Sequence, residues 1–148
     1  MSAPHVAIVG ATGAVGQEFL RVLAERDFPM RSMKLLASPR SAGKTMCYGG
    51  EELSVEALDE HSFRGVDVAF FSAGGGTSLK YAPKAVASGC VVVDNSSAYR
   101  MHQDVPLIVP EVNREAMGSH QGILANPNCS TIILVLALAP LQQQASIQ

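Results

Sequence analysis

Three features of the sequence predict an α/β fold, with a mostly parallel sheet covered by helices on both faces. Candidate strands alternate with longer amphipathic segments, which is the order expected of βαβ units. The candidate strands are apolar on both faces, as in sheets that are buried on both sides. Polar and glycine-rich segments follow the candidate strands, at residues 10–16, 38–43, 72–77, 95–100 and 126–130. Because ligands bind beyond the carboxyl ends of parallel strands, these loops predict a Rossmann-like fold with one site along that edge.

The first half of the chain begins with a predicted buried strand and an amphipathic helix. Residues 5–10 (HVAIVG) form a short β-branched run that ends in glycine. Residues 14–28 place apolar side chains on one face and charges on the other, and Pro29 closes this helix. Further strands are predicted at residues 32–38, 51–58 and 66–76.

The second half continues the alternation. A helix is predicted after Thr77; Pro83 indicates that it starts afresh at the proline, and Gly89 ends it. Strands are predicted at residues 90–97, 105–113 and 122–128, and an apolar helix follows Cys129. This helix, at 131–141, is apolar on every side, so we expect an exposed apolar patch unless other elements cover it.

The composition limits the possible partners. The chain has 148 residues, of which 47% are hydrophobic and 16% charged, and its net charge is −2. These values fit one soluble globular domain and predict that neither nucleic acid nor a membrane is a partner. The N-terminus lacks the features of a signal peptide. Three cysteines without metal-ligand spacing predict no disulfide framework, no metal site and a cytoplasmic location.

Gly10, Gly13 and Gly16 lie between the first predicted strand and the first helix. Glycine permits a tight turn and a close approach of the backbone to a pyrophosphate, and the N-terminus of a helix attracts anions. The segment therefore predicts a dinucleotide-binding loop. The alternative is a plain turn between a strand and a helix.

The residues after the second strand indicate which nucleotide binds. An NAD-binding domain usually has an acidic residue there, which binds a ribose hydroxyl. This chain instead has Ser38, Arg40, Ser41 and Lys44. A guanidinium and a hydroxyl suit a 2′-phosphate, so we predict NADP as the cofactor. The alternative is that Arg40 is a solvated surface charge.

Cys129 follows a turn (Asn126, Pro127, Asn128) and precedes Ser130 and Thr131, which are frequent at helix starts. The positive end of a helix favours the thiolate, which is the nucleophilic form of cysteine. Cys129 is therefore predicted to be a nucleophile. Cys90 opens a strand and is predicted to fill the core, whereas Cys47 lies in a predicted polar turn and has no assigned role.

Six motifs together resemble the aspartate-semialdehyde dehydrogenase family: GATGAVGQ, LLASPRSAGK, FFSAGGGTS, VVVDNSSAYR, VPLIVPEVN and NPNCSTI. They follow the family's order and cover nearly the whole stretch from Val6 to Leu138. The resemblance implies the NADP-dependent interconversion of L-aspartyl 4-phosphate and L-aspartate 4-semialdehyde, in which phosphate is released or taken up. This reaction is an early step toward lysine, threonine and methionine. It also implies a homodimer or homotetramer at full length.

The resemblance assigns roles to individual positions. Cys129 matches the nucleophile that forms the acyl thioester, and Arg100 matches the arginine that binds phosphate. Arg40 and Ser41 match the contacts to the 2′-phosphate. The family's pyrophosphate-binding loop is matched by the segment that begins at Gly10, at Thr12, Gly13, Ala14 and Val15.

The length departs from the family, whose members continue well beyond residue 148. We therefore expect an NADP-binding domain at 1–130, a helix at 131–148 that leads into a truncated substrate domain, and no activity from the chain alone. The four histidines match none of the family's acid or base positions. Two alternatives remain: an N-acetyl-glutamyl-phosphate reductase-like enzyme, and a nucleotide-binding module without catalysis.

Overall fold

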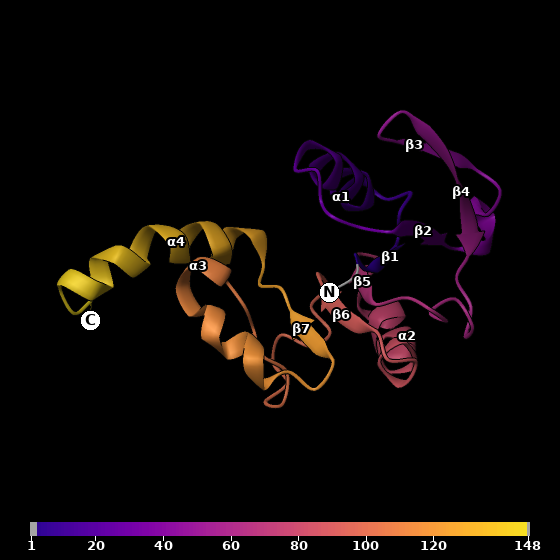
Figure 1. Cartoon of the computed structure of the whole chain (residues 1–148). Coiled ribbons are helices and arrows are strands. Elements are labelled where there is room, and N and C mark those ends of the chain that lie inside the picture. Colours follow the sequence, from indigo (N-terminus) through magenta and orange to yellow (C-terminus); the bar gives the residue numbers. More distant parts are fainter. Residues whose placement is uncertain (1–2, 148) are drawn as a thin grey trace.

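A computed structural model describes residues 3–147 (Figure 1). Within this range, seven strands form one sheet in the order β3-β4-β2-β1-β5-β6-β7. The strands are β1 (His5–Val9), β2 (Ser32–Ala37), β3 (Thr45–Tyr48), β4 (Glu51–Ala57), β5 (Val68–Phe71), β6 (Val91–Asp94) and β7 (Ile123–Ala125). All neighbours are parallel except β3, which runs antiparallel to β4. The predicted α/β, Rossmann-like fold is confirmed.

The order of the strands reverses at β1. From this strand the chain adds β2 and β4 on one side, and it then crosses back to place β5 on the other. The register pairs Val6 with Met33 of β2 and with Val68 of β5. In open parallel sheets, such a reversal separates the loops after two neighbouring strands and opens a crevice at their carboxyl ends.

Alternate side chains of β1 build two separate cores. Ile8 packs with Leu20 and Leu23 of α1 (Ala14–Glu25) on one face. Ala7 and Val9 point to the other face, into a core that includes residues of α2 (Gly75–Ala87). The two helices therefore cover opposite faces of the sheet, as the apolar strands predicted.

Helix α2 contradicts the prediction of a fresh start at Pro83, since it runs through the proline without a break. Proline removes the amide that would bond to the carbonyl of Leu79. Pro83 and Leu79 both lie on the exposed side, where water can reach that carbonyl. Burial of Ala82 and Ala85 against the sheet holds the helix together.

Two further predictions need correction. Cys47 lies in strand β3 rather than in a polar turn; the four-residue strand lacks an alternating apolar pattern and was missed. The predicted strand at 105–113 is reduced to a single bridge between Leu107 and Ala125, followed by helix α3 (Pro110–Asn113). Proline is favoured at the first position of a helix.

Helix α4 (Cys129–Gln144) leaves the carboxyl end of β7 and extends away from the sheet beside α3 (Figure 1). None of its described residues is buried, and Ile133 is 71% exposed. The predicted exposure of its apolar side chains is confirmed. Within residues 3–147, no helix is both long enough and apolar enough to cross a membrane.

Candidate functional site

The turn between β1 and α1 depends on two of its three glycines for packing. Gly10 has φ +87°, and a Cβ there would lie 2.5 Å from the carbonyl oxygen of Ser72. A Cβ on Gly16 would lie 2.3 Å from the carbonyl oxygen of Gly10. A Cβ on Gly13 would meet only that same oxygen, at 3.3 Å. Gly16 thus lets α1 pack close to the turn after β1, and Gly10 lets that turn approach the segment after β5. Gly13 has no such close backbone neighbour.

The N-terminus of α1 is bare. Gly13 is its N-cap and provides no side-chain hydrogen bond, and the first turn contains no acidic residue. The first amide groups of a helix have no partner within the helix. The amides of Ala14, Val15 and Gly16 can therefore bind an anion, which the helix dipole also attracts.

A cavity of about 370 Å³ lies beside this turn, at the point where the order of the strands reverses. Its walls come from the ends of β1, β2, β4 and β5 and from α2: Val9, Gly10, Thr12, Gly13, Ala37, Ser38, Pro39, Leu58, Ser72, Ala73, Thr77 and Tyr81. Most of these residues are small, so much of the lining is backbone, and Leu58 and Tyr81 supply larger side chains. This combination suits a ligand with an anionic linker and a flat apolar ring.

Hydrogen bonds fix the segment after β2. Residues Pro39–Ser41 form a 3₁₀ turn, in which the amide of Ser41 donates to the carbonyl of Ser38 at 2.8 Å. The Thr12 hydroxyl donates to Ser41 Oγ at 3.4 Å, so this segment lies next to the glycine turn. Arg40 is exposed and does not line the cavity.

Cys129 is the first residue of α4, and its side chain is exposed. The cap of this helix is Asn128, whose Oδ1 accepts a hydrogen bond from the amide of Ser130 at 2.9 Å. The same oxygen lies 3.8 Å from Cys129 Sγ. Asn128 therefore fixes the turn that presents the thiol, and Ser130 and Thr131 lie inside the helix.

Arg100 joins the loops that follow β6 and β7. Its Nε donates to the carbonyl of Asn126 at 2.9 Å, and its Nη2 donates to the carbonyl of Asn95 at 3.0 Å. The Asn126 side chain also donates to Asn95 Oδ1 at 2.7 Å. Arg100 is half-buried, and it holds the loop that precedes Cys129.

Sequence reasoning missed Asp94, the last residue of β6. The side chain is fully buried and accepts hydrogen bonds from the hydroxyls of Ser78 and Ser96, both at 2.7 Å. Burial and the charge of Asp94 raise the pKa of the Tyr99 phenol. Asp94 ties α2 to the loop that carries Arg100. A lone acid at the end of an all-valine strand was the signal available in the sequence.

The three cysteines lie in different environments. Cys90 is buried, and this burial raises the pKa of its thiol to about 12, so its predicted place in the core is confirmed. Cys47 and Cys129 are both exposed. Cys129 lies at the same edge of the sheet as the glycine turn. The loops that follow β1 and β7 are about 14 Å apart, which is three strand spacings, so an extended ligand is needed to reach both.

Residues 5–120 match a family described as the semialdehyde dehydrogenase, NAD-binding domain. The chain belongs to this family. The aspartate-semialdehyde dehydrogenase of Synechocystis sp. is 55% identical over 144 residues, which are 97% of this chain and 43% of that protein. The enzyme of the same name from Bacillus subtilis is 52% identical and is covered over 40% of its length. This semialdehyde dehydrogenase domain thus spans less than half of these relatives.

Solved structures of semialdehyde dehydrogenases share the fold. Aspartate semialdehyde dehydrogenase II from Vibrio cholerae, complexed with ASA, matches with a TM-score of 0.95 and 48% identity, over 99% of this chain and 48% of that chain. The enzyme from Candida albicans with NADP matches with a TM-score of 0.76 and 28% identity, over 95% and 47%. The resemblance predicted from the sequence is confirmed.

Proposed function

We propose that this chain is the nucleotide-binding and nucleophile-bearing part of an NADP-dependent aspartate-semialdehyde dehydrogenase. The reaction is the reductive dephosphorylation of L-aspartyl 4-phosphate to L-aspartate 4-semialdehyde, and its reverse, through an acyl thioester. The observation that carries this proposal is the position of Cys129, an exposed thiol at the first position of α4 on the edge of the sheet where α1 also begins.

The chain's own residues would perform the acyl transfer. The thiolate of Cys129 attacks the acyl carbon, an S–C bond forms, and the bond to phosphate breaks. Amide groups at the start of α4, other than that of Ser130, which is bonded to Asn128, are available to a developing oxyanion. Arg100 binds the phosphate through its remaining nitrogen while its other two stay bonded to the loops. When bound, NADPH would supply a hydride to the thioester carbon. Release of the semialdehyde then breaks the S–C bond and returns the thiolate of Cys129.

The residues of the first cavity fit the nucleotide. Gly10, Thr12, Gly13, Ala14 and Val15 would hold the pyrophosphate at the bare start of α1. The side chains of Leu58 and Tyr81 line the cavity and offer apolar surface to a nucleobase. No acidic side chain lines the cavity to repel a 2′-phosphate, and Arg40 and Ser41 lie beside it. These features favour NADP over NAD.

Residues 1–130 would form the NADP-binding domain, and 131–148 would lead into a domain for substrate binding and dimerisation. The apolar faces of α4 give such a domain, or a second subunit, a surface to cover. We further propose that the protein works in the cytoplasm on a small-molecule substrate, in the pathway to lysine, threonine and methionine.

A chimaera tests the proposed reaction. This chain replaces the matching 43% of the Synechocystis relative, and turnover is measured with NADP, phosphate and either L-aspartate 4-semialdehyde or N-acetyl-glutamate semialdehyde. We expect turnover of the aspartate compound only. Cys129→Ser in the chimaera should remove turnover and leave NADP affinity unchanged. Turnover that survives this substitution would exclude Cys129 as the nucleophile, and preference for the second aldehyde would reassign the enzyme.

A further inference from the structure

The loops that follow β6 and β7 lie side by side, and each begins with an asparagine. Asp94 and Ala125 end their strands and pair with each other in the parallel register. Asn95 and Asn126 come next, and Asn126 Nδ2 donates to Asn95 Oδ1 at 2.7 Å. The amide of Asn126 also donates to the carbonyl of Asp94 at 2.8 Å. The pairing of the two strands thus continues for one residue beyond the sheet, through side chains.

The guanidinium of Arg100 is bound by the backbone of the same two asparagines. Its Nε donates to the carbonyl of Asn126 at 2.9 Å, and its Nη2 donates to the carbonyl of Asn95 at 3.0 Å. A guanidinium is planar and its donors have a fixed spacing, so it can bind both carbonyls only while they stay at that spacing. The bond between the two asparagine side chains holds the carbonyls there. Without this bond, the loops can separate and Arg100 loses one of its two acceptors.

The charge of Arg100 is available to an anion. Both of its hydrogen bonds go to neutral carbonyl oxygens, and no ion pair within residues 3–147 involves this side chain. Its Nη1 makes no hydrogen bond in the same part of the chain. The asparagine pair therefore holds the guanidinium in place without neutralising it, as the binding of a phosphate requires.

Asn126 is also closely connected to the thiol. Cys129 is three residues further along the chain, a span of at most about 10 Å. Pro127, between them, is buried, and its ring fixes φ. Asn128 caps α4 by accepting a hydrogen bond from the amide of Ser130 at 2.9 Å. A displacement of Asn126 therefore moves the thiol of Cys129 as well as the guanidinium.

We propose that Asn126 is a positioning residue for the acyl transfer. Its side-chain bond to Asn95 keeps the guanidinium of Arg100 and the thiol of Cys129 at the spacing that one acyl phosphate needs. In this substrate a single oxygen joins the attacked carbon to the phosphorus, so the nucleophile and the phosphate-binding group must act on neighbouring atoms. Groups that are held in this alignment need not be brought together during the reaction. The inference rests on the proposed function, because it takes an acyl phosphate to be the substrate.

Alkylation of the 148-residue chain with iodoacetate and with iodoacetamide tests the inference without turnover. Only iodoacetate is an anion, so the ratio of the two rates at Cys129 reports a cation held near the thiol. Arg100→Met should lower this ratio about twofold to threefold at low ionic strength, the effect of one charge at about 8 Å in water. Asn126→Ala should lower the ratio by most of that amount, while the iodoacetamide rate stays within about twofold of wild type.

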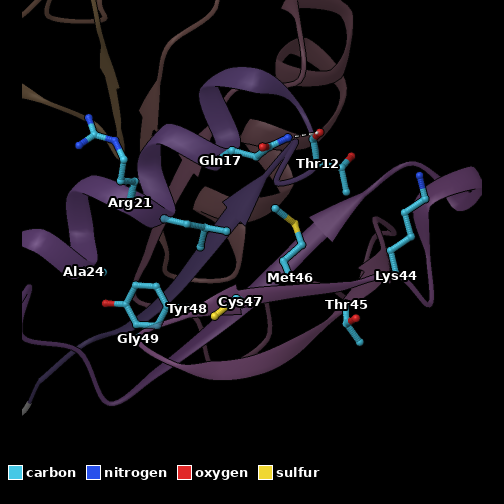
Figure 2. Close-up of a pocket in the computed structure, with 11 residues that line it drawn as sticks. Thr12, Gln17, Arg21, Ala24, Lys44, Thr45, Met46, Cys47, Tyr48 and Gly49 are labelled. Atoms are coloured by element: carbon cyan, nitrogen blue, oxygen red, sulfur yellow. Dashed lines mark hydrogen bonds between the residues drawn. The ribbon is translucent and has the colours of Figure 1, made fainter.

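Inorganic phosphate provides a second measurement on the same chain. It should slow the reaction of Cys129 with iodoacetate in the wild type more than chloride does at equal ionic strength, because it competes for Arg100. This difference should disappear in Asn126→Ala. Cys47 is the internal reference, since β3 and β7 are the two edges of the sheet. Figure 2 shows Cys47 on β3, beside the cavity of about 630 Å³ between α1 and β3, and its ratio should be the same in wild type and Asn126→Ala.

Two further variants separate position from loop stability. Asn95→Ala breaks the same side-chain bond from the other loop and should act like Asn126→Ala, and it replaces that variant if Asn126→Ala does not fold. The double variant should lose no more than either single one. Asn113→Ala is the matched control, because it removes an asparagine with two hydrogen bonds to the backbone and leaves the two loops joined. It should keep the wild-type ratio even where it lowers the melting temperature.

The chimaera described above shows whether the spacing matters for turnover. Asn126→Ala should lower kcat about tenfold or more, as expected when reacting groups are misaligned, and keep the KM for L-aspartate 4-semialdehyde within about threefold. Asn113→Ala should keep both. The inference is overturned, while the proposed function stands, if Asn126→Ala keeps either the wild-type ratio or the wild-type kcat, or if Asn113→Ala loses as much. An unchanged ratio in Arg100→Met would overturn both the inference and the proposed role of Arg100.

Discussion

Helices α1 and α4 both begin after a strand at the same edge of the sheet, yet they differ at their starts and along their lengths. The start of α1 has glycine as its N-cap and no side-chain hydrogen bond, and the helix buries Gly16, Leu20 and Leu23. The start of α4 is capped by the side chain of Asn128, and none of its described residues is buried. Helix α1 packs on the sheet, whereas α4 mainly touches α3 outside its own start, and that start is held by a local cap.

This difference shows how two helix starts at one edge of the sheet can serve different chemistry, anion binding at α1 and a nucleophile at α4. Packing against β1 fixes α1, so its first amides can stay unpaired and available to an anion. Without such packing, the first turn of α4 relies on Asn128, and that cap places a thiol at the helix start. A bare start suits ligand binding, whereas a capped start with an exposed cysteine suits a nucleophile.

The contrast between buried and exposed regions is sharpest for the cysteines. At neutral pH the raised pKa of Cys90, about 12 against an ordinary 9.0, lowers its thiolate fraction about a thousandfold. Alkylation followed by peptide mapping should therefore modify Cys90 last. Cys47 is exposed in a strand and serves as the control for Cys129, which should react first if it is the nucleophile proposed above. Faster labelling of Cys47 would contradict an activated thiol at α4.

The glycine turn of α1 can be broken at one position and altered at another. Gly10→Ala places a Cβ 2.5 Å from the Ser72 carbonyl at a positive φ, and it should lower the free energy of unfolding by about 3 kcal/mol or more. Gly13→Ala meets backbone only at 3.3 Å and should keep the melting temperature while weakening NADP binding. Thermal unfolding and nucleotide titration separate the two effects. Equal melting temperatures for both variants would argue against the close contact at Gly10.

The cap of α4 can be removed without touching its thiol. Asn128→Ala deletes the acceptor of the Ser130 amide and should destabilise the first turn by about 1 kcal/mol. Hydrogen exchange of the α4 amides measures this as about fivefold faster opening. Thr131→Ala removes a hydroxyl from the same turn and should leave exchange unchanged. Identical exchange in Asn128→Ala and wild type would show that the cap does not hold the helix.

The smallest expected effect on stability is at the exposed surface of α4. Ile133 is 71% exposed, so Ile133→Gln should change the free energy of unfolding by less than about 0.5 kcal/mol. It should nevertheless reduce the binding of a hydrophobic dye and self-association, because it interrupts an apolar surface. Chemical denaturation, dye fluorescence and light scattering provide the measurements. A large loss of stability would mean that Ile133 is covered in solution.

The sequence alone determined the features that depend on local patterns. Short apolar runs predicted β1, β2, β5 and β6, because buried parallel strands need apolar side chains on both faces. The glycine spacing and the turn before Cys129 located the two helix starts, because turns and caps are set by a few neighbouring residues. The prediction that Cys90 lies in the core followed from the same local pattern.

Only the tertiary structure decided the features that depend on distant contacts. Pro83 stays inside α2 because Ala82 and Ala85 pack on the sheet, and strand β3 forms because β4 pairs with it. The buried carboxylate of Asp94 receives one of its hydrogen bonds from Ser78, sixteen residues earlier. The loop of residues 43 and 44 is held against β4 by backbone hydrogen bonds with Val55. Such contacts join residues far apart in the chain, and no local pattern contains them.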